Sequence, residues 1–278
     1  MTIKELLKQA VKGSGSRELL GIELLLAHAL KIERKDLITK SNDIVKANDI
    51  VTFQKSYFRF KKGEPVEHIL GFKEFYGMPF KVNDKVLIPR PETEHLVEYV
   101  LKLIEGGGVK SALDVGTGSG CIAISIASNS EATRVAGCDV SLDALNVARE
   151  NNATLANGMV ELFQSDLLSD VSESFDVIVA NLPYIGTEKF NFVSDEAKRY
   201  EPEVALFGGT DGLTLYEKLF EQIVELTERP KYLIGEFGFL QGDHMRALLN
   251  KYFEQYEWEI IKDYASIERM FVVTFASL

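Results

Sequence analysis

The tetrapeptide Asn181-Leu182-Pro183-Tyr184 follows an apolar segment, residues 175–180, that is typical of a buried β-strand. The Asn181 side-chain oxygen and the Leu182 carbonyl can each accept one hydrogen of a planar NH₂ group. Pro183 biases Leu182 towards an extended backbone and so fixes the direction of that carbonyl, while Tyr184 offers a ring on which a planar group can stack. Unless it is only a turn that ends a strand, this segment predicts a site for an amide or aromatic amine nitrogen.

A glycine-rich loop, Gly116-Thr117-Gly118-Ser119-Gly120, follows another expected strand. Its Gly-x-Gly-x-Gly spacing differs from the dinucleotide-binding pattern, and no lysine follows it as in phosphate-binding loops. Asp114, just before the loop, would repel a pyrophosphate but suits the amino group and sulfonium of S-adenosylmethionine. We therefore expect this loop to bind S-adenosylmethionine, with the methyl group of the cofactor directed towards the tetrapeptide.

Two aspartates end the next two expected strands. Asp139 lies 19 residues after Gly120, close to where a ribose-binding carboxylate belongs in a nucleoside-binding fold. Asp166 is placed to accept a hydrogen bond from an adenine amino group, and Ser141 can cap the helix that follows Asp139. The alternative for both aspartates is a solvated charge at the end of a strand.

Short apolar segments alternate with helical ones from Glu92 onwards, which predicts a parallel sheet covered by helices on both faces. Open sheets of this kind bind ligands at the carboxyl ends of their strands, where the loop and the tetrapeptide lie. The last two strands have no helix between them and are expected to pair antiparallel. The expected strands are residues 111–115, 134–139, 159–164, 175–180, 232–236, 258–262 and 269–275.

The first part of the chain has a different pattern. Apolar residues recur every three or four positions up to about Phe60, which predicts a small helical bundle. An aromatic and β-branched stretch with a turn at Asn83-Asp84 indicates a hairpin. We expect a helical substrate-recognition domain at residues 1–74, a linking β-hairpin at 75–90 and a catalytic domain at 91–278.

The composition, 46% apolar and 26% charged, is typical of a globular protein with a sizeable core. No signal-peptide-like or membrane-spanning run is present in the sequence, so we expect a cytoplasmic protein without membrane contacts. Cys121 and Cys138 form no disulfide framework and are expected to be small buried residues. The four histidines lack metal-ligand spacing, and we expect no metal.

The net charge of −11 conceals an asymmetry. Residues 1–75 hold 14 Lys/Arg and 10 Asp/Glu, whereas the remainder is net −15, which disfavours stable binding of nucleic acid by the second part. The densest basic cluster alternates with aromatic residues and is either a solvated helix face or a docking surface. It consists of Lys55, Arg59, Lys61 and Lys62.

Three further segments resemble those of bacterial release factor glutamine methyltransferases: residues 71–77, residues 87–94, and residues 200–206 with 208–213. The resemblance covers nearly the whole chain. It implies a Rossmann-like class I S-adenosylmethionine-dependent methyltransferase domain with a seven-stranded, mostly parallel α/β sheet, preceded by an all-α bundle and a hairpin. The implied substrate is the glutamine of the Gly-Gly-Gln motif in class 1 peptide chain release factors, gripped in part by the bundle.

The resemblance also implies residue roles. Gly116 to Gly120, Asp139, Asp166, Leu167 and Asn181 would bind the cofactor, and the tetrapeptide would bind the substrate. Arg90 and Glu92 would either shape the entrance to the site or form an ion pair that anchors the hairpin. One position departs from the family: its usual motif is Asn-Pro-Pro-Tyr, and Leu182 replaces the first proline, which removes one ring constraint.

Other acceptors fit the same chemistry. A glutamine of a ribosomal protein is the nearest alternative, and an exocyclic amino group of a nucleic acid base is the second. The net charge of the catalytic part argues against the base. A cofactor-binding module without catalysis is disfavoured by the intact Asn181, Pro183 and Tyr184.

Overall fold

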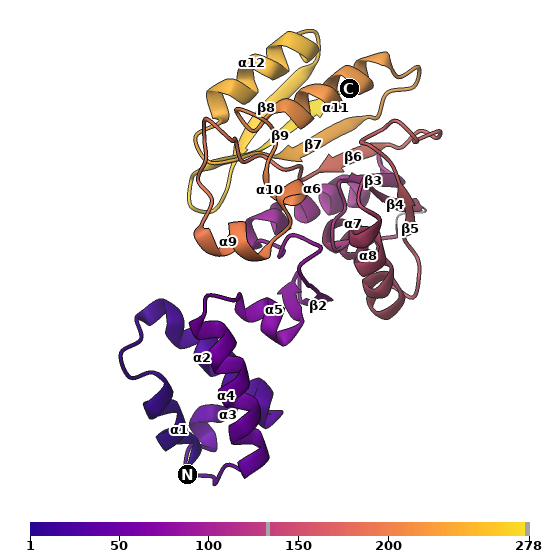
Figure 1. Cartoon of the computed structure of the whole chain (residues 1–278). Helices are drawn as coiled ribbons and strands as arrows, with labels where there is room; N and C mark the ends of the chain where they lie inside the picture. Colours follow the sequence, from indigo (N-terminus) through magenta and orange to yellow (C-terminus); the bar gives the residue numbers. More distant parts are fainter. Residues whose placement is uncertain (132–133, 276–278) are drawn as a thin grey trace. The chain divides into compact units, whose positions relative to one another are not determined.

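The computed structural model describes residues 1–131 and 134–275 (Figure 1). The chain divides into two compact units, Met1–Phe72 and Lys73–Leu278. Residues 132–133 and 276–278, which fall within the predicted catalytic domain, lie outside the described part of the chain.

The first unit is a bundle of helices, as the apolar periodicity predicted. Thr2 and Glu5 form a reciprocal capping box at the start of the first helix. Ile22, Leu26 and Phe53 are fully buried in the bundle core. The helices are α1 (Ile3–Ala10), α2 (Ser16–Leu30), α3 (Asp36–Thr39), α4 (Ala47–Lys61) and α5 (Val66–Leu70).

The hairpin lies earlier in the chain than predicted. Its strands are β1 (Phe72–Phe75) and β2 (Met78–Lys81), so the prediction of a turn at Asn83-Asp84 was wrong. The two connecting residues, Tyr76 and Gly77, have φ values of 48° and 73°. Two consecutive positive φ angles are the signature of the two-residue turns that match the twist of paired strands.

The second unit contains a seven-stranded sheet of order β5-β4-β3-β6-β7-β9-β8 within the described residues. Strands β3 to β7 are parallel, and β9 pairs antiparallel with both β7 and β8, as predicted for the last two strands. The strands are β3 (Ser111–Val115), β4 (Arg134–Asp139), β5 (Glu161–Gln164), β6 (Val177–Ala180), β7 (Tyr232–Glu236), β8 (Glu257–Lys262) and β9 (Glu268–Thr274).

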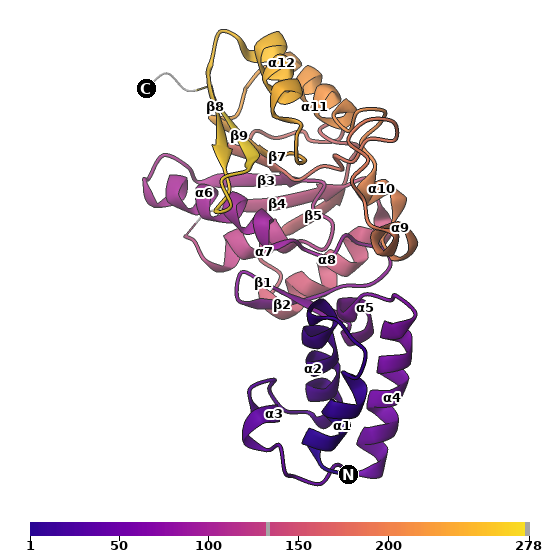
Figure 2. The ribbon, with the colours of Figure 1, turned by 90° about the vertical axis from the view of Figure 1, so that its left-hand side faces the viewer.

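Helices cover both faces of this sheet (Figures 1 and 2). In β6, Val177 and Val179 pack into a core with α6 and α7, whereas Ile178 and Ala180 pack into a core with α11 and α12. This alternation follows from the two-residue period of a strand and explains the uninterrupted apolar run in the sequence. The helices of this unit are η1 (Pro91–Thr93), α6 (Glu94–Glu105), α7 (Cys121–Ser128), α8 (Leu142–Leu155), α9 (Asp195–Tyr200), α10 (Glu203–Leu206), α11 (Thr214–Glu225) and α12 (Gly242–Phe253).

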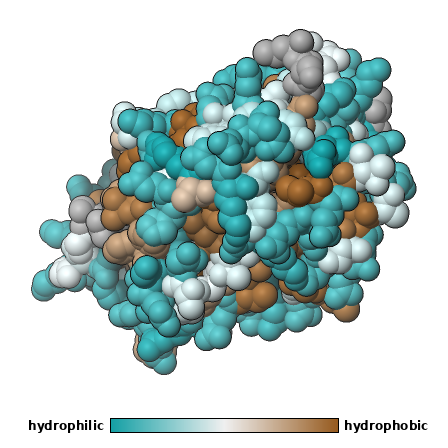
Figure 3. Space-filling view, turned by 90° about the horizontal axis from the view of Figure 1, so that it is seen from above, coloured by the Kyte–Doolittle hydropathy of each residue, from teal (hydrophilic) through white to brown (hydrophobic). Residues whose placement is uncertain are grey.

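The surface in Figure 3 is mainly hydrophilic, with hydrophobic residues gathered in separate patches. Among the residues that the structure describes, no helix combines the length and apolar character needed to cross a membrane. Cys138 is fully buried and Cys121 is partly buried.

Candidate active site

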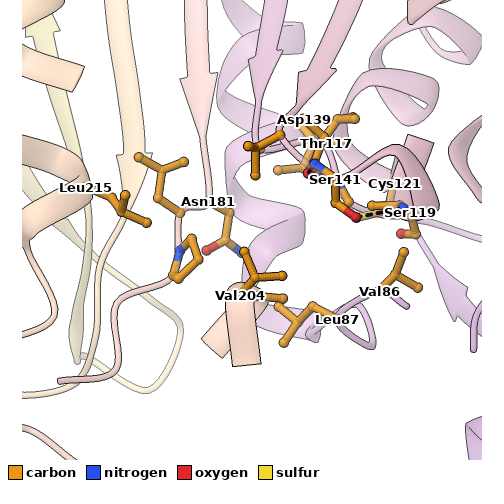
Figure 4. A pocket seen from close by; sticks show the side chains of 18 of the residues that line it. Val86, Leu87, Thr117, Ser119, Cys121, Asp139, Ser141, Asn181, Val204 and Leu215 are labelled. Carbon is orange, nitrogen blue, oxygen red and sulfur yellow. Dashed lines mark hydrogen bonds between the residues drawn. The ribbon is translucent and has the colours of Figure 1, made fainter. Parts of the chain in front are cut away.

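A cavity at the carboxyl ends of the parallel strands brings together most of the predicted site residues. This first cavity is lined by Gly116 to Ser119 of the glycine-rich loop, Asp139, Asp166, Leu167 and the segment Asn181 to Pro183. In Figure 4, Thr117, Ser119, Asp139 and Ser141 lie on one side of the cavity and Asn181 on the other. The loop after β3, the ends of β4 and β5, and the end of β6 therefore face one space, as expected for an open α/β sheet.

The glycine-rich loop is held by β4. The backbone N–H groups of Gly116 and Thr117 donate to the Cys138 carbonyl, each at 2.9 Å. Gly118 donates its N–H to Asp139 Oδ2 at 2.9 Å and has a φ of 56°. Glycine adopts this left-handed conformation at little cost, which keeps the loop tight and its backbone open to the cavity.

Two residues expected at the cofactor, Asp114 and Gly120, are not part of the lining of the first cavity. Asp114 does not line the cavity: it is buried, and its Oδ2 accepts hydrogen bonds from Thr117 Oγ1 at 2.7 Å and from the Ala123 N–H at 3.2 Å. Gly120 also faces the protein interior, where an added Cβ would lie 2.7 Å from Ile124 Cδ1. Both residues therefore shape the loop from behind, and burial raises the pKa of Asp114 to about 7.

The two strand-end aspartates differ in environment. Asp139 is partly buried, and its two oxygens accept from the N–H groups of Gly118 and Ser141 at 2.9 and 2.8 Å. Burial raises the pKa of Asp139. Asp166 is exposed and forms an ion pair with Lys218 at 2.5 Å. Ser141 caps α8 by accepting from the Ala144 N–H at 3.2 Å, as predicted.

The acceptor tetrapeptide is anchored by buried side chains. Asn181 donates from Nδ2 to Thr93 Oγ1 at 2.9 Å, and the Tyr184 hydroxyl donates to Glu236 Oε1 at 3.1 Å. The Tyr184 carbonyl accepts from Gln241 Nε2 at 2.8 Å, and Gln241 is fully buried. Both ends of the tetrapeptide are thus fixed by residues far from it in the sequence.

Leu182 is held more firmly than the missing ring constraint suggested. Its side chain is buried, and its Cδ2 lies 3.0 Å from the position that a Cβ on Gly116 would take. Its backbone N–H, which a proline would lack, donates to the Tyr216 hydroxyl at 3.4 Å. The departure from the family motif therefore adds a hydrogen bond in place of a ring.

A second cavity adjoins the first and shares Leu87, Arg90 and Asn181 to Pro183 with it. Tyr184 lines this second cavity and not the first, so a planar group stacked on its ring would enter from this side. Phe192 and Phe239 form an edge-to-face pair on its wall, with ring centroids 6.3 Å apart, and both are exposed. An apolar, partly aromatic wall next to the tetrapeptide is suited to a protruding segment of a substrate.

Comparisons with known proteins agree with this geometry. Residues 2–71 match the family model "PrmC N-terminal domain", and residues 93–196 match "Methyltransferase small domain". The release factor glutamine methyltransferase of Bacillus subtilis (strain 168) is 36% identical over 94% of each chain. That of Bacillus anthracis is 34% identical over 97% of this chain and 98% of its own.

The chain belongs to the release factor glutamine methyltransferase family. Solved structures show the same fold at low identity. The hMettl16 catalytic domain in complex with MAT2A 3'UTR hairpin 6 aligns with a TM-score of 0.56 at 13% identity, over 84% of this chain and 83% of its own. The N-terminal domain of human METTL16 in complex with SAH gives 0.52 at 14% identity, over 85% of each chain. The predicted fold class, a class I methyltransferase domain after a helical bundle and a hairpin, is confirmed.

This family fold implies S-adenosylmethionine as the methyl donor, and the first cavity fits it. The buried Oδ1 of Asp114 has no hydrogen-bond partner among the described residues. A hydrogen-bond acceptor without a donor therefore lies directly behind the glycines of the loop. Asp139 adds a second carboxylate on the wall itself. Two carboxylates beside an open glycine backbone suit a ligand that carries an amino group, a sulfonium and a ribose.

Arg90 forms an ion pair, but with Glu201 and not with Glu92. Its Nη2 lies 2.6 Å from Glu201 Oε1, and Glu201 Oε2 accepts the Ile88 N–H at 3.0 Å. Arg90 also lines both cavities. The pair joins two of the family-like segments, residues 87–94 and 200–206.

Four residues around the tetrapeptide were not singled out from the sequence: Thr93, Tyr216, Glu236 and Gln241. Glu236 had a usable signal, because it is a carboxylate at the carboxyl end of the strand next to β6. Thr93 lies inside the family-like segment 87–94 but carries no chemical signature of its own. Among the residues that the structure describes, no group of three or more His, Cys, Asp or Glu side chains is arranged to hold a metal ion.

Proposed function

We propose that this protein transfers a methyl group from S-adenosylmethionine to the side-chain amide nitrogen of the glutamine in the Gly-Gly-Gln motif of class 1 peptide chain release factors. Family membership over nearly the full length supports the protein substrate. The single observation that carries the chemistry is the placement of Asn181 and Leu182 between the first cavity and the second.

Each part of the site has a role in this proposal. Gly116 to Ser119, Asp139, Asp166 and Leu167 would hold S-adenosylmethionine in the first cavity, where it supplies an electrophilic methyl group. The second cavity would receive the glutamine side chain beside Tyr184. Asn181 Oδ1 and the Leu182 carbonyl would accept the two amide hydrogens and so direct the nitrogen lone pair towards the first cavity.

Proton balance needs no strong base. The amide nitrogen gains a methyl group and loses one of its hydrogens, and a nitrogen alkylated on an amide releases that proton readily to water. The site must therefore mainly hold and orient a weak nucleophile, a task that suits fixed hydrogen-bond acceptors.

The helical unit would contribute to substrate recognition. On α4, Arg59 is paired with Glu64 and Lys61 with Glu18. Lys62, the residue directly after α4, lies over the exposed Phe58 ring, 4.2 Å from its centroid, and Lys55 is exposed on α4 itself. This basic and aromatic surface would bind acidic parts of the release factor.

A panel of acceptors tests the proposed function. The protein is incubated with methyl-labelled S-adenosylmethionine and, separately, with purified release factor, ribosomal proteins, tRNA and DNA. We expect label in the release factor. Label confined to ribosomal protein or to nucleic acid would contradict the proposal and identify the class of acceptor instead.

A further inference from the structure

A buried carboxylate joins two residues of the acceptor tetrapeptide through separate oxygens. Glu236 Oε2 accepts from Thr93 Oγ1 at 2.8 Å, and its Oε1 accepts from the Tyr184 hydroxyl at 3.1 Å. Thr93 Oγ1 in turn accepts from Asn181 Nδ2 at 2.9 Å. Thr93 and Glu236 are 2% and 3% exposed, so water does not compete for these bonds.

The number of available protons gives this chain of bonds a direction. An ionised carboxylate only accepts hydrogen bonds, so the Thr93 hydroxyl must use its single proton on Glu236. The Thr93 oxygen is then left as an acceptor, and only the NH₂ end of the Asn181 amide can satisfy it. The Asn181 Oδ1 atom is consequently turned away from Thr93 and towards the cavities.

We propose that Thr93 and Glu236 are positioning residues, which hold the Asn181 amide in the one orientation that offers its oxygen to the substrate NH₂. This proposal rests on the proposed function. An Asn181 side chain rotated by half a turn would present its own NH₂ to the substrate NH₂, two donors that cannot bond. The same carboxylate holds the Tyr184 hydroxyl, so both ends of the tetrapeptide share one anchor.

Thr93→Val is the most direct test, because valine keeps the shape of threonine and removes the hydroxyl. We expect kcat on release factor to fall by about 10- to 100-fold, the order of effect of a small misplacement of a reacting group. The KM for S-adenosylmethionine should stay within about threefold, since the first cavity is not altered in charge. Thr93→Ser keeps the hydroxyl and should recover kcat to within about threefold of the unmodified chain.

A double-mutant cycle separates positioning from general damage. In an Asn181→Ala background the amide is gone, so Thr93→Val should lower kcat by less than about twofold further. An equal fall in both backgrounds would show that Thr93 does not act through Asn181, and would overturn the proposal. Full activity of Thr93→Val would also overturn it.

Methyl transfer by the unmodified chain distinguishes a failure of this proposal from a failure of the proposed function. Transfer to release factor by the unmodified chain, together with normal activity of Thr93→Val, removes only the positioning role. Absence of any transfer to release factor by the unmodified chain removes both. If Thr93→Val unfolds below the assay temperature, Glu236→Gln takes its place in the cycle, and the same non-additivity with Asn181→Ala is expected or the proposal fails.

Discussion

The backbone N–H of Leu182 donates a hydrogen bond to the hydroxyl of Tyr216 at 3.4 Å. Tyr216 is fully buried, and its own proton is within reach of the carbonyls of Ala180 and Glu236. One hydroxyl thus connects the ends of β6 and β7 to the residue that departs from the family motif. The pairing gives Leu182 a restraint that a proline at this position would obtain from its ring.

Tyr216→Phe should therefore destabilise the protein by about 1–3 kcal/mol, because it leaves the buried Leu182 N–H without an acceptor. Leu182→Pro removes that N–H, so it should cost less in the Tyr216→Phe background than in the unmodified chain. Urea unfolding of the four proteins measures the coupling, which we expect to be at least about 0.5 kcal/mol. Strictly additive changes would show that the bond contributes nothing.

Activity should depend on the ionisation of Glu236. Burial raises the pKa of Glu236 to about 7, against the lowering effect of the hydrogen bonds from Thr93 and Tyr184. Protonation lets Glu236 donate to Thr93 and frees Asn181 to rotate, so kcat should fall as the pH decreases through about 7. The ionisable side chains that share its surroundings are Glu92, Cys121, Tyr184, Tyr216, Arg269 and, around a small adjoining cavity, His95, Lys262 and Asp263.

The Glu236→Gln variant cannot titrate at this position. Its kcat should be lower than that of the unmodified chain at pH 8 and should lack the decrease near pH 7, whereas Asp114→Asn should retain that decrease. If kcat of Glu236→Gln decreased near pH 7 as it does in the unmodified chain, the decrease would belong to another ionisable group.

The raised pKa of Glu236 also determines how the stability of the protein varies with pH. The pKa of Glu236 is higher in the folded state than its ordinary value of 4.5, so the folded state binds more protons than the unfolded state between about pH 4.5 and 7. The stabilising contribution is present below pH 4.5 and is lost as the pH rises through about 7. Glu236→Gln should therefore be more stable than the unmodified chain at pH 8, by on the order of 1 kcal/mol, and this advantage should vanish near pH 4.5. Equal melting temperatures at pH 8 would contradict this.

Substitution of the two strand-end aspartates, Asp139 and Asp166, should lower the affinity for the cofactor to different degrees. Asp139 accepts two backbone hydrogen bonds that hold the loop, and a bond to a charged group contributes about 1.5–3 kcal/mol. Asp139→Ala should weaken S-adenosylmethionine binding by about 10- to 100-fold in calorimetry. Asp166 is exposed and paired with Lys218, so Asp166→Ala should weaken it by less than about fivefold. The reverse order would place the main polar contact of the cofactor at Asp166.

Release factor binding should depend on the exposed charges of α4 and of Lys62, which follows it. Charge reversal at Lys55 and Lys62 should weaken binding by about tenfold at low salt, with a smaller effect at high salt because exposed charges are screened. Reversal at Lys8 and Lys12, also exposed in the helical unit, is the matched control for net charge. Equal effects of the two double variants would show that only net charge matters and that α4 is a solvated face.

Features with local causes could be predicted from the sequence. Strands β3, β4 and β7 begin and end at the predicted residues, because each has a buried, mainly apolar centre between polar turns. The hairpin was misplaced because Tyr76 was not recognised as a turn residue, although Gly77 follows it. An aromatic residue with positive φ is uncommon, and sequence patterns give it little weight.

Features that depend on distant residues could not be predicted. The Thr93 and Glu236 side chains are 143 positions apart, and neither has a spacing that indicates the other. Asp114 was expected to face the ligand because it precedes the glycines; its Oδ2 is held by Thr117 and the start of α7, whereas its Oδ1 has no hydrogen-bond partner among the described residues. The sequence therefore indicated which segments meet at the sheet edge, while the fold decides which side chains face inwards.

The position of the transferred methyl group tests the central claim most directly. Release factor is incubated with the protein and S-adenosylmethionine, digested, and analysed by fragmentation mass spectrometry, with Asn181→Ala as the comparison. We predict one methyl group on the side-chain amide nitrogen of the Gly-Gly-Gln glutamine, formed about 100- to 1,000-fold more slowly by Asn181→Ala. A methyl group on any other residue, or an unchanged rate with Asn181→Ala, would contradict the account.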